Sequence, residues 1–168
     1  MIEMELVGVR VELPANQPIV LLKEREGTRY LPIWIGAVEA TVIAFALQGV
    51  DTARPLTHDL FVNVLGELDV ELTAVHVTDL QDGTFFAELH LQRAEQEWTI
   101  TSRPSDAIAL ASRMADVPLF ASQDVLDSAG LEIEPAEEGD LEESGNAEEE
   151  VRQFREFLDE VSPEDFKG

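Results

Sequence analysis

The 168-residue chain contains no cysteine, is 45% apolar and carries 35 acidic against 11 basic residues, for a formal net charge of −24. The absence of cysteine excludes a disulfide framework, a thiolate zinc site and a cysteine nucleophile, and it fits a reducing compartment. The negative charge repels nucleic acid and anionic membranes, so any nucleic-acid chemistry would need a local basic patch or a divalent metal.

The chain shows no signal for export or membrane insertion. Its acidic start, Met1 to Glu5, lacks the basic and apolar regions of a signal peptide. No apolar run approaches the roughly 18–20 residues that a membrane-spanning helix needs. We therefore expect a cytoplasmic protein that does not contact membranes.

The first half predicts three strands followed by two helices. Strands are indicated over residues 3–13, 19–22 and 30–35, and in the first of them Val7, Val9 and Val11 share one face. A helix from Gly36 to Gln48 has so few polar residues that we expect it to be buried on all sides, between layers. Gly49 ends this helix, and Thr57 is the predicted N-cap of a second helix that reaches about Leu68.

The second half predicts the same order of elements. Strands are indicated over residues 70–78, 85–91 and 98–101, with Asp82-Gly83 as a hairpin turn. Pro104 opens a helix that ends near Met114, and a short apolar segment at 118–120 precedes a helix over 122–129. With an offset of 67 residues, Glu39-Ala40 aligns with Asp106-Ala107. We predict an α+β fold in which a βββαα unit occurs twice, with mixed or antiparallel sheets around central helices.

The C-terminal part has a different composition. Residues 131–168 hold 15 acidic and 3 basic residues and thus half of the net charge. We predict a domain over 1–130, an acidic linker over 131–146, an amphipathic helix over 147–162 and a disordered end over 163–168. A helix this short is marginal alone, so residues 147–162 are expected to pack on their own domain or on a protein partner.

Two segments could carry chemistry. Arg54-Pro55-Leu56-Thr57-His58-Asp59 places a cation, a hydroxyl, an imidazole and a carboxylate at one helix N-terminus, where anions bind well. Arg103-Pro104-Ser105-Asp106 repeats the theme, and Asp106, like Glu39, falls at about the third helical position. From the residues alone, capping and the helix dipole are the favoured explanation of these residues. If the two halves bring Glu39 and Asp106 together, however, this acidic pair could bind Mg²⁺ or Mn²⁺.

Three motifs in order resemble the bacterial bifunctional nuclease family: Leu31-Pro32-Ile33-Trp34-Ile35-Gly36 with Glu39-Ala40, then Arg54 to Asp59, then Arg103 to Ala109. The likeness covers residues 1 to about 130, and the ending Phe157 to Phe166 is similar to the tail of some bacterial members. The resemblance implies an internally duplicated α+β fold and hydrolysis of both DNA and RNA. It makes the matching motif positions candidates: His58, Asp59, Arg54 and Arg103 as catalytic residues, and Glu39 and Asp106 as metal ligands.

Two functions follow from these observations. The first is a nuclease that hydrolyses phosphodiester bonds of DNA and RNA, assisted by Mg²⁺ or Mn²⁺ and without an organic cofactor. The alternative is a non-catalytic binding or regulatory module that docks a protein partner through residues 147–162. A homo-oligomer is compatible with both.

Overall fold

The computed structural model describes residues 1–12 and 16–132, and the predicted acidic linker, C-terminal helix and end segment lie outside the described residues. Residues Met1–Ile133 form one compact unit. Its first half contains β1 (Ile2–Glu12), β2 (Gln17–Glu24), β3 (Arg29–Trp34), α1 (Ala37–Leu47) and α2 (Thr57–Glu67). The second half contains β4 (Glu71–Gln81), β5 (Thr84–Arg93), β6 (Gln96–Ser102), α3 (Pro104–Ala111), β7 (Leu119–Ala121), α4 (Gln123–Ala129) and β8 (Leu131–Glu132). The predicted α+β class is confirmed.

The strands form one mixed sheet with the order β6-β5-β4-β7-β1-β2-β3-β8. Each half supplies an antiparallel three-stranded meander, and β7 joins the two meanders by pairing parallel to β4 and antiparallel to β1. The apolar segment at 118–120 is therefore the strand that makes the sheet continuous, in place of separate sheets. The order of elements recurs in the two halves apart from β7 and β8, while the duplication itself stays a prediction.

The faces of β1 differ from the simple alternation that the sequence predicts. The register with β2 shifts between Leu6 and Gly8, and Gly8 has a φ of +152°, which glycine adopts most readily. This bulge turns Val7 outward, where it is 43% exposed, while Leu6 and Val9 both pack against the core. The prediction that Val7 and Val9 share a face is wrong because a bulge shifts the period of two by one residue.

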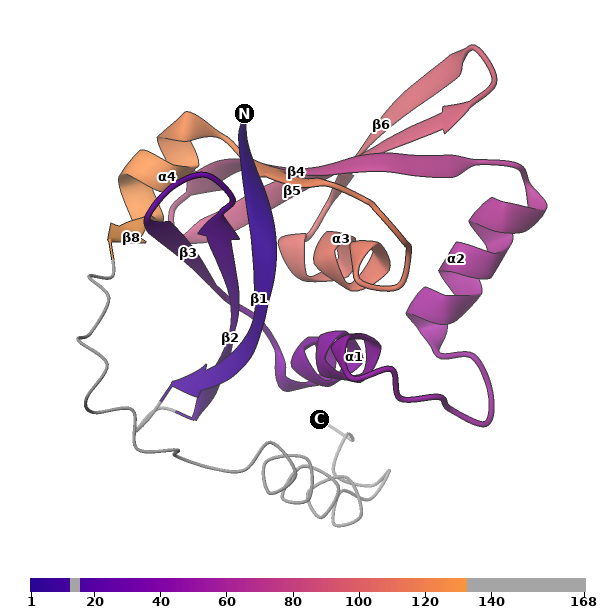
Figure 1. The fold of residues 1–168 in the computed structure, drawn as a ribbon, viewed down its shortest axis with the longest axis horizontal. Coiled ribbons are helices and arrows are strands. Elements are labelled where there is room, and N and C mark those ends of the chain that lie inside the picture. The colour runs from indigo at the N-terminus through magenta and orange to yellow at the C-terminus, as the bar shows by residue number, and fades with distance from the viewer. Residues whose placement is uncertain (13–15, 133–168) are drawn as a thin grey trace. The chain divides into compact units, whose positions relative to one another are not determined.

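The central helix is α3, and α1 lies beside it (Figure 1). Every residue of α3 except Asp106 is buried, and the helix contacts β4, β5, α1 and α2. In α1 the buried residues are Ala40 and Ile43 alone, and Val38 is 68% exposed. The prediction that α1 is buried on all sides is therefore wrong: its composition is apolar all round, but in the described structure its neighbours β1, β2 and α3 do not surround it.

The core is one continuous cluster of apolar side chains. The strand over 85–91 contributes Ala87, Leu89 and Leu91 to it, as its alternation predicts. Helix α4 contacts both β3 and β4, which stand four places apart in the sheet, so the sheet must curve around its helices. Among the described residues, no helix combines the length and apolar character that crossing a bilayer requires.

Candidate functional site

Three helices begin with a carboxylate at their third position. Glu39 holds this place in α1, Asp59 in α2 and Asp106 in α3. An acidic side chain in the first turn is favoured by the helix dipole, which explains the residue type locally. The N-cap of α2 is Leu56, so the prediction of Thr57 as N-cap is off by one residue. The Leu56 N–H donates to Asp59 Oδ2 at 2.8 Å, and this bond satisfies a donor at the helix start.

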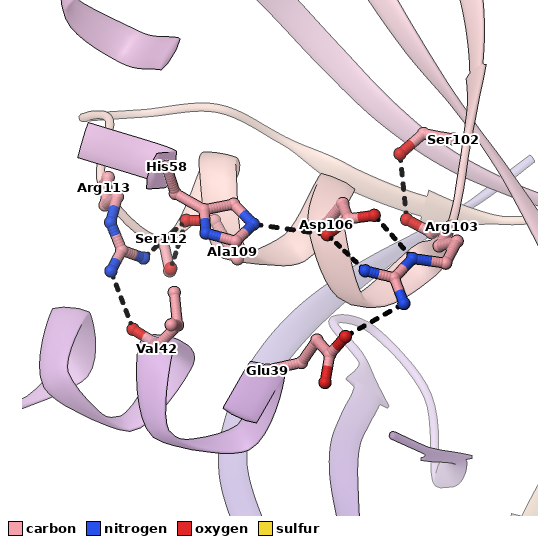
Figure 2. A network of polar contacts seen from close by, with 9 residues as sticks. All are labelled: Glu39, Val42, His58, Ser102, Arg103, Asp106, Ala109, Ser112 and Arg113. Carbon is pink, nitrogen blue, oxygen red and sulfur yellow. Dashed lines mark hydrogen bonds and ion pairs between the residues drawn. The ribbon is translucent and has the colours of Figure 1, made fainter. Parts of the chain in front are cut away.

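Arg103, the N-cap of α3, joins the first turns of α1 and α3 (Figure 2). Its Nε donates to Asp106 Oδ2 at 2.7 Å, and its Nη2 donates to Asp106 Oδ1 at 3.0 Å. Its Nη1 lies 2.9 Å from Oε1 of Glu39. One guanidinium thus bridges two carboxylates that lie 67 residues apart in the sequence and align with each other in the two halves. The Arg103 side chain is 64% exposed.

His58 completes this cluster from the first turn of α2. Its Nε2 lies 3.3 Å from Asp106 Oδ1, and its side chain is only 17% exposed. The hydrogen bond from Arg103 is the main cause that holds the pKa of Asp106 below its usual range, so this carboxyl group is ionised and can only accept. In the neutral form of the ring, His58 Nε2 must therefore carry the proton, and Nδ1 is then an acceptor.

Asp59 points to a different partner. Arg113, which follows the end of α3, donates from Nε to Asp59 Oδ1 at 2.6 Å and from its terminal nitrogens to the carbonyls of Ala109 and Val42, each at 2.9 Å. Only 8% of the Arg113 side chain is exposed. This residue therefore ties α1, α2 and the end of α3 together, and sequence reasoning missed it. The available signal was its position as the single charged residue between Asp106 and Asp116.

The surroundings of Asp59 act on its pKa in opposite directions. Burial raises the pKa of this carboxyl group, while hydrogen bonds from Leu56 N–H and Arg113 lower it, and the net shift is downward. The ion pair lines a depression of about 220 Å³, whose other walls come from the end of α1 and the loop before α2, among them Phe45 and Thr52.

The six predicted site residues thus fall into three groups. Glu39, His58, Arg103 and Asp106 form the cluster of Figure 2, which we call the Arg103 cluster. Asp59 belongs to the ion pair with Arg113. Arg54 is exposed, and within the described part of the chain its side chain forms no hydrogen bond or ion pair, although its carbonyl accepts from Thr52 Oγ1.

The carboxylate oxygens of the Arg103 cluster are the type of ligand that a hard divalent cation prefers. No group of three or more histidine or acidic residues in the described ranges is arranged as a metal-binding set. Magnesium, however, keeps several waters and is commonly held by one or two carboxylates together with substrate phosphates. Glu39 and Asp106 both contact the Arg103 guanidinium, which in this structure supplies the positive charge between the two carboxylates.

All six predicted residues lie in the segment 20–134, which matches the family model of the bifunctional nuclease domain. The chain belongs to the bifunctional nuclease domain family. Strand β1 precedes the matched segment, so the family match begins in β2 and runs to the end of the described residues.

Relatives of this bifunctional nuclease domain protein come from bacteria and plants. An uncharacterized protein of Mycobacterium tuberculosis is 48% identical over 166 residues, which cover 99% of this chain and 98% of that protein. Bifunctional nuclease 2 of Arabidopsis thaliana is 29% identical over 123 residues, or 71% of this chain and 37% of the plant protein. Bifunctional nuclease 1 of the same plant is 28% identical over 123 residues and covers 38% of that protein.

Proposed function

We propose that this protein hydrolyses phosphodiester bonds of DNA and RNA at the Arg103 cluster. Membership of the bifunctional nuclease domain family supports this function, as do the names of the two plant relatives. The observation that carries the proposal is the contact of His58 with Asp106, beside an exposed guanidinium. A histidine oriented by a carboxylate next to a phosphate-binding cation is a suitable arrangement for hydrolysing a phosphodiester.

Each residue of the cluster has a defined task in this reaction. His58 Nδ1 takes the proton from the attacking water, and Asp106 holds the ring and stabilises the imidazolium that forms. Arg103 binds the non-bridging oxygens of the phosphate, where negative charge accumulates in the transition state. Because 64% of the Arg103 side chain is exposed, its guanidinium can reach a phosphate outside the protein surface.

The charge of the cluster favours assistance by a divalent cation. Glu39, Asp106 and Arg103 together carry one excess negative charge when His58 is neutral, and the whole chain is strongly acidic. A phosphodiester would meet net repulsion at this site. Mg²⁺ or Mn²⁺ held by Glu39 and Asp106 would neutralise the phosphate and lower the pKa of a bound water. With the carboxylates so engaged, Arg103 would be free to pair with the phosphate.

Degradation of labelled DNA and RNA by the purified full-length protein tests this function. Reactions contain Mg²⁺, Mn²⁺ or EDTA and compare the wild type with the Glu39→Gln/Asp106→Asn double variant. The matched control is Glu67→Gln/Asp124→Asn, which removes the same charge from exposed positions at the end of α2 and in α4. We expect metal-dependent cleavage of both polymers by the wild type and the control, and its loss in the Glu39/Asp106 variant.

Two results would argue against this account. Equal cleavage by the Glu39/Asp106 variant and the wild type would place the reaction elsewhere. No cleavage by folded wild-type protein under any of these conditions would favour a non-catalytic binding module. That alternative depends on residues 147–162, which lie outside the described residues, and its support is the acidic composition of the chain after Gly130.

A further inference from the structure

The two edges of the sheet are built differently. At one edge β3 pairs with β8, a strand of only two residues, which covers Arg29 and Tyr30. The remainder of β3 contains Pro32, which lacks the N–H that an added strand would need. Short edge strands and proline are devices that prevent a sheet from pairing with other chains. This edge is therefore protected against further growth.

The opposite edge, β6, lacks such protection within residues 1–12 and 16–132. Among these residues it pairs with β5 alone, and six of its seven residues are exposed. Its sequence, Gln96-Glu97-Trp98-Thr99-Ile100-Thr101-Ser102, contains no proline, lysine or arginine. The registers with β5 run without a shift from Ala87 to Arg93, so no bulge bends this edge away. A regular edge strand without proline, lysine, arginine or a bulge is a template for pairing with another strand.

Two apolar side chains of β6 are partly exposed in the described structure. Trp98 lies opposite Leu91 and Ile100 opposite Leu89, and both leucines are buried in the core. Trp98 and Ile100 therefore lie on the core-facing side of the sheet, yet they are 38% and 46% exposed. A surface formed by unpaired backbone groups and two large apolar residues is suited to a protein partner.

We propose that β6 pairs with β6 of a second copy of this chain, in antiparallel orientation about a two-fold axis through Thr99. In this register Trp98 of each copy lies opposite Ile100 of the other, so the uncovered apolar residues cover each other on one face. Glu97 lies opposite Thr101, so no two acidic residues face each other directly. An aromatic residue opposite a β-branched one is a favourable cross-strand pair, and facing like charges would be unfavourable.

The choice of a second copy rests on this self-complementarity, since a two-fold interface must match its own surface. A basic partner is disfavoured because Glu97 is the one acidic residue of β6. A second exposed apolar surface, formed by Leu60, Phe61 and Val64 of α2 and by its C-cap Leu68, offers no unpaired strand edge. Each copy carries a charge of −24, so long-range repulsion opposes the dimer and salt will strengthen it.

Analytical ultracentrifugation of the full-length protein at low and high salt tests the proposal. We expect the wild type to form a dimer whose dissociation constant falls as salt is added. Ile100→Lys places a charge in the centre of the edge, and Thr99→Pro removes a backbone N–H, so both should yield monomers. Val38→Lys, at an exposed position of α1, is the matched control and should remain dimeric. Circular dichroism establishes that each variant is folded, and Ile100→Lys alone decides if Thr99→Pro does not fold.

Three outcomes would overturn the proposal. The first is a dimer that persists in folded Ile100→Lys protein. The second is a dimer that dissociates with Leu60→Lys but not with Ile100→Lys, which would move the interface to α2. The third is a wild-type monomer at all salt concentrations.

Discussion

Nε2 of His58 lies 3.3 Å from Oδ1 of Asp106, although 48 residues separate them in the sequence. The contact exists because the first turn of α2 packs close to the first turn of the buried helix α3. It assigns the proton of the neutral imidazole to Nε2 and leaves Nδ1 to accept a proton from water. The orientation of His58 therefore depends on the charge of Asp106.

Asp106→Asn tests this dependence. The amide can donate to His58 Nε2 and so stabilise the opposite tautomer, in which Nδ1 carries the proton and cannot act as a base. General base catalysis contributes about 100-fold to 10,000-fold in enzymes, and we expect a fall in kcat of that order. Steady-state cleavage of a labelled oligonucleotide measures it, with Asp124→Asn as control. An unchanged kcat would show that Asp106 does not orient a base.

Arg103→Ala should reduce cleavage without unfolding the protein. The side chain is 64% exposed, and exposed ion pairs contribute at most about 1 kcal/mol to stability. Loss of one charged donor to the transition state typically costs about 100-fold or more in kcat. Arg103→Lys should restore part of the rate, because it keeps the charge but loses the two-point contact with Asp106.

Thermal unfolding and kinetics of the same protein samples separate the two effects. The matched control is Arg25→Ala, since Arg25 has an equally exposed side chain and pairs with Glu3 far from the cluster. A large fall in thermal midpoint for Arg103→Ala would mean that the arginine is structural, and the loss of rate would then say nothing about phosphate binding.

Arg113→Ala should destabilise the domain strongly. The side chain is 8% exposed and bonds to Asp59 and to the carbonyls of Ala109 and Val42, so its removal leaves three acceptors short of a donor. Breaking a fully buried ion pair costs roughly 3 kcal/mol or more. Because the Asp59 side chain is 32% exposed, the free energy of unfolding should fall by about 2 kcal/mol. Urea denaturation measures it, with Arg25→Ala as the exposed control, and an equally small loss for the two variants would contradict the role of Arg113 as the link between helices.

Acid should unfold the protein through the carboxylates of the site. Arg103 lowers the pKa of Asp106, and hydrogen bonds from Leu56 and Arg113 overcome burial to lower that of Asp59. A carboxyl group whose pKa is lower in the folded than in the unfolded state stabilises the fold above the unfolded value of about 3.9. That stabilisation is lost as pH falls through the lower, folded pKa. The free energy of unfolding should therefore decrease below about pH 4.

Urea denaturation from neutral pH down to pH 3 measures this dependence. The Asp59→Asn/Asp106→Asn variant lacks both groups and should show a shallower decrease than the wild type, even though it is less stable at neutral pH. Parallel curves for the two proteins would mean that neither carboxyl group titrates differently in the folded and unfolded states.

Local pattern in the sequence predicts most of the elements of this fold. The alternation of Ala87, Leu89 and Leu91 identifies a strand with one buried face, and Pro104 marks a helix start, because these signals act over a few residues. Features that depend on residues distant in the sequence are harder to predict from local pattern. The composition of α1 gives no indication that in the described structure Val38 is exposed while the less apolar α3 is buried. The bulge at Gly8 likewise depends on the pairing of β1 with β2.

In the candidate site, too, local rules predict the positions of single residues but not their partners. Glu39 and Asp106 can be placed at the third position of their helices from local rules, and the repeat suggests that they meet. That Arg103 bridges them, and that His58 and Asp59 point to different partners, follows from how α1, α2 and α3 pack. Adjacent residues in a first helical turn point in directions about 100° apart, so neighbours in the sequence need not share a site. Arg113 lies in none of the sequence motifs, and its three contacts are known only from the structure, because they depend on how the helices pack.

The central claim is that His58 acts as the base in cleavage of nucleic acid. The measurement that tests it most directly is the initial rate of cleavage of labelled DNA and RNA by folded His58→Ala protein, compared with His90→Ala. His90 lies on β5 between the buried residues Leu89 and Leu91, apart from the Arg103 cluster, and is therefore a matched histidine control. We predict that His58→Ala lowers both rates about 100-fold or more while His90→Ala changes them little. Equal rates for the two variants would contradict the account.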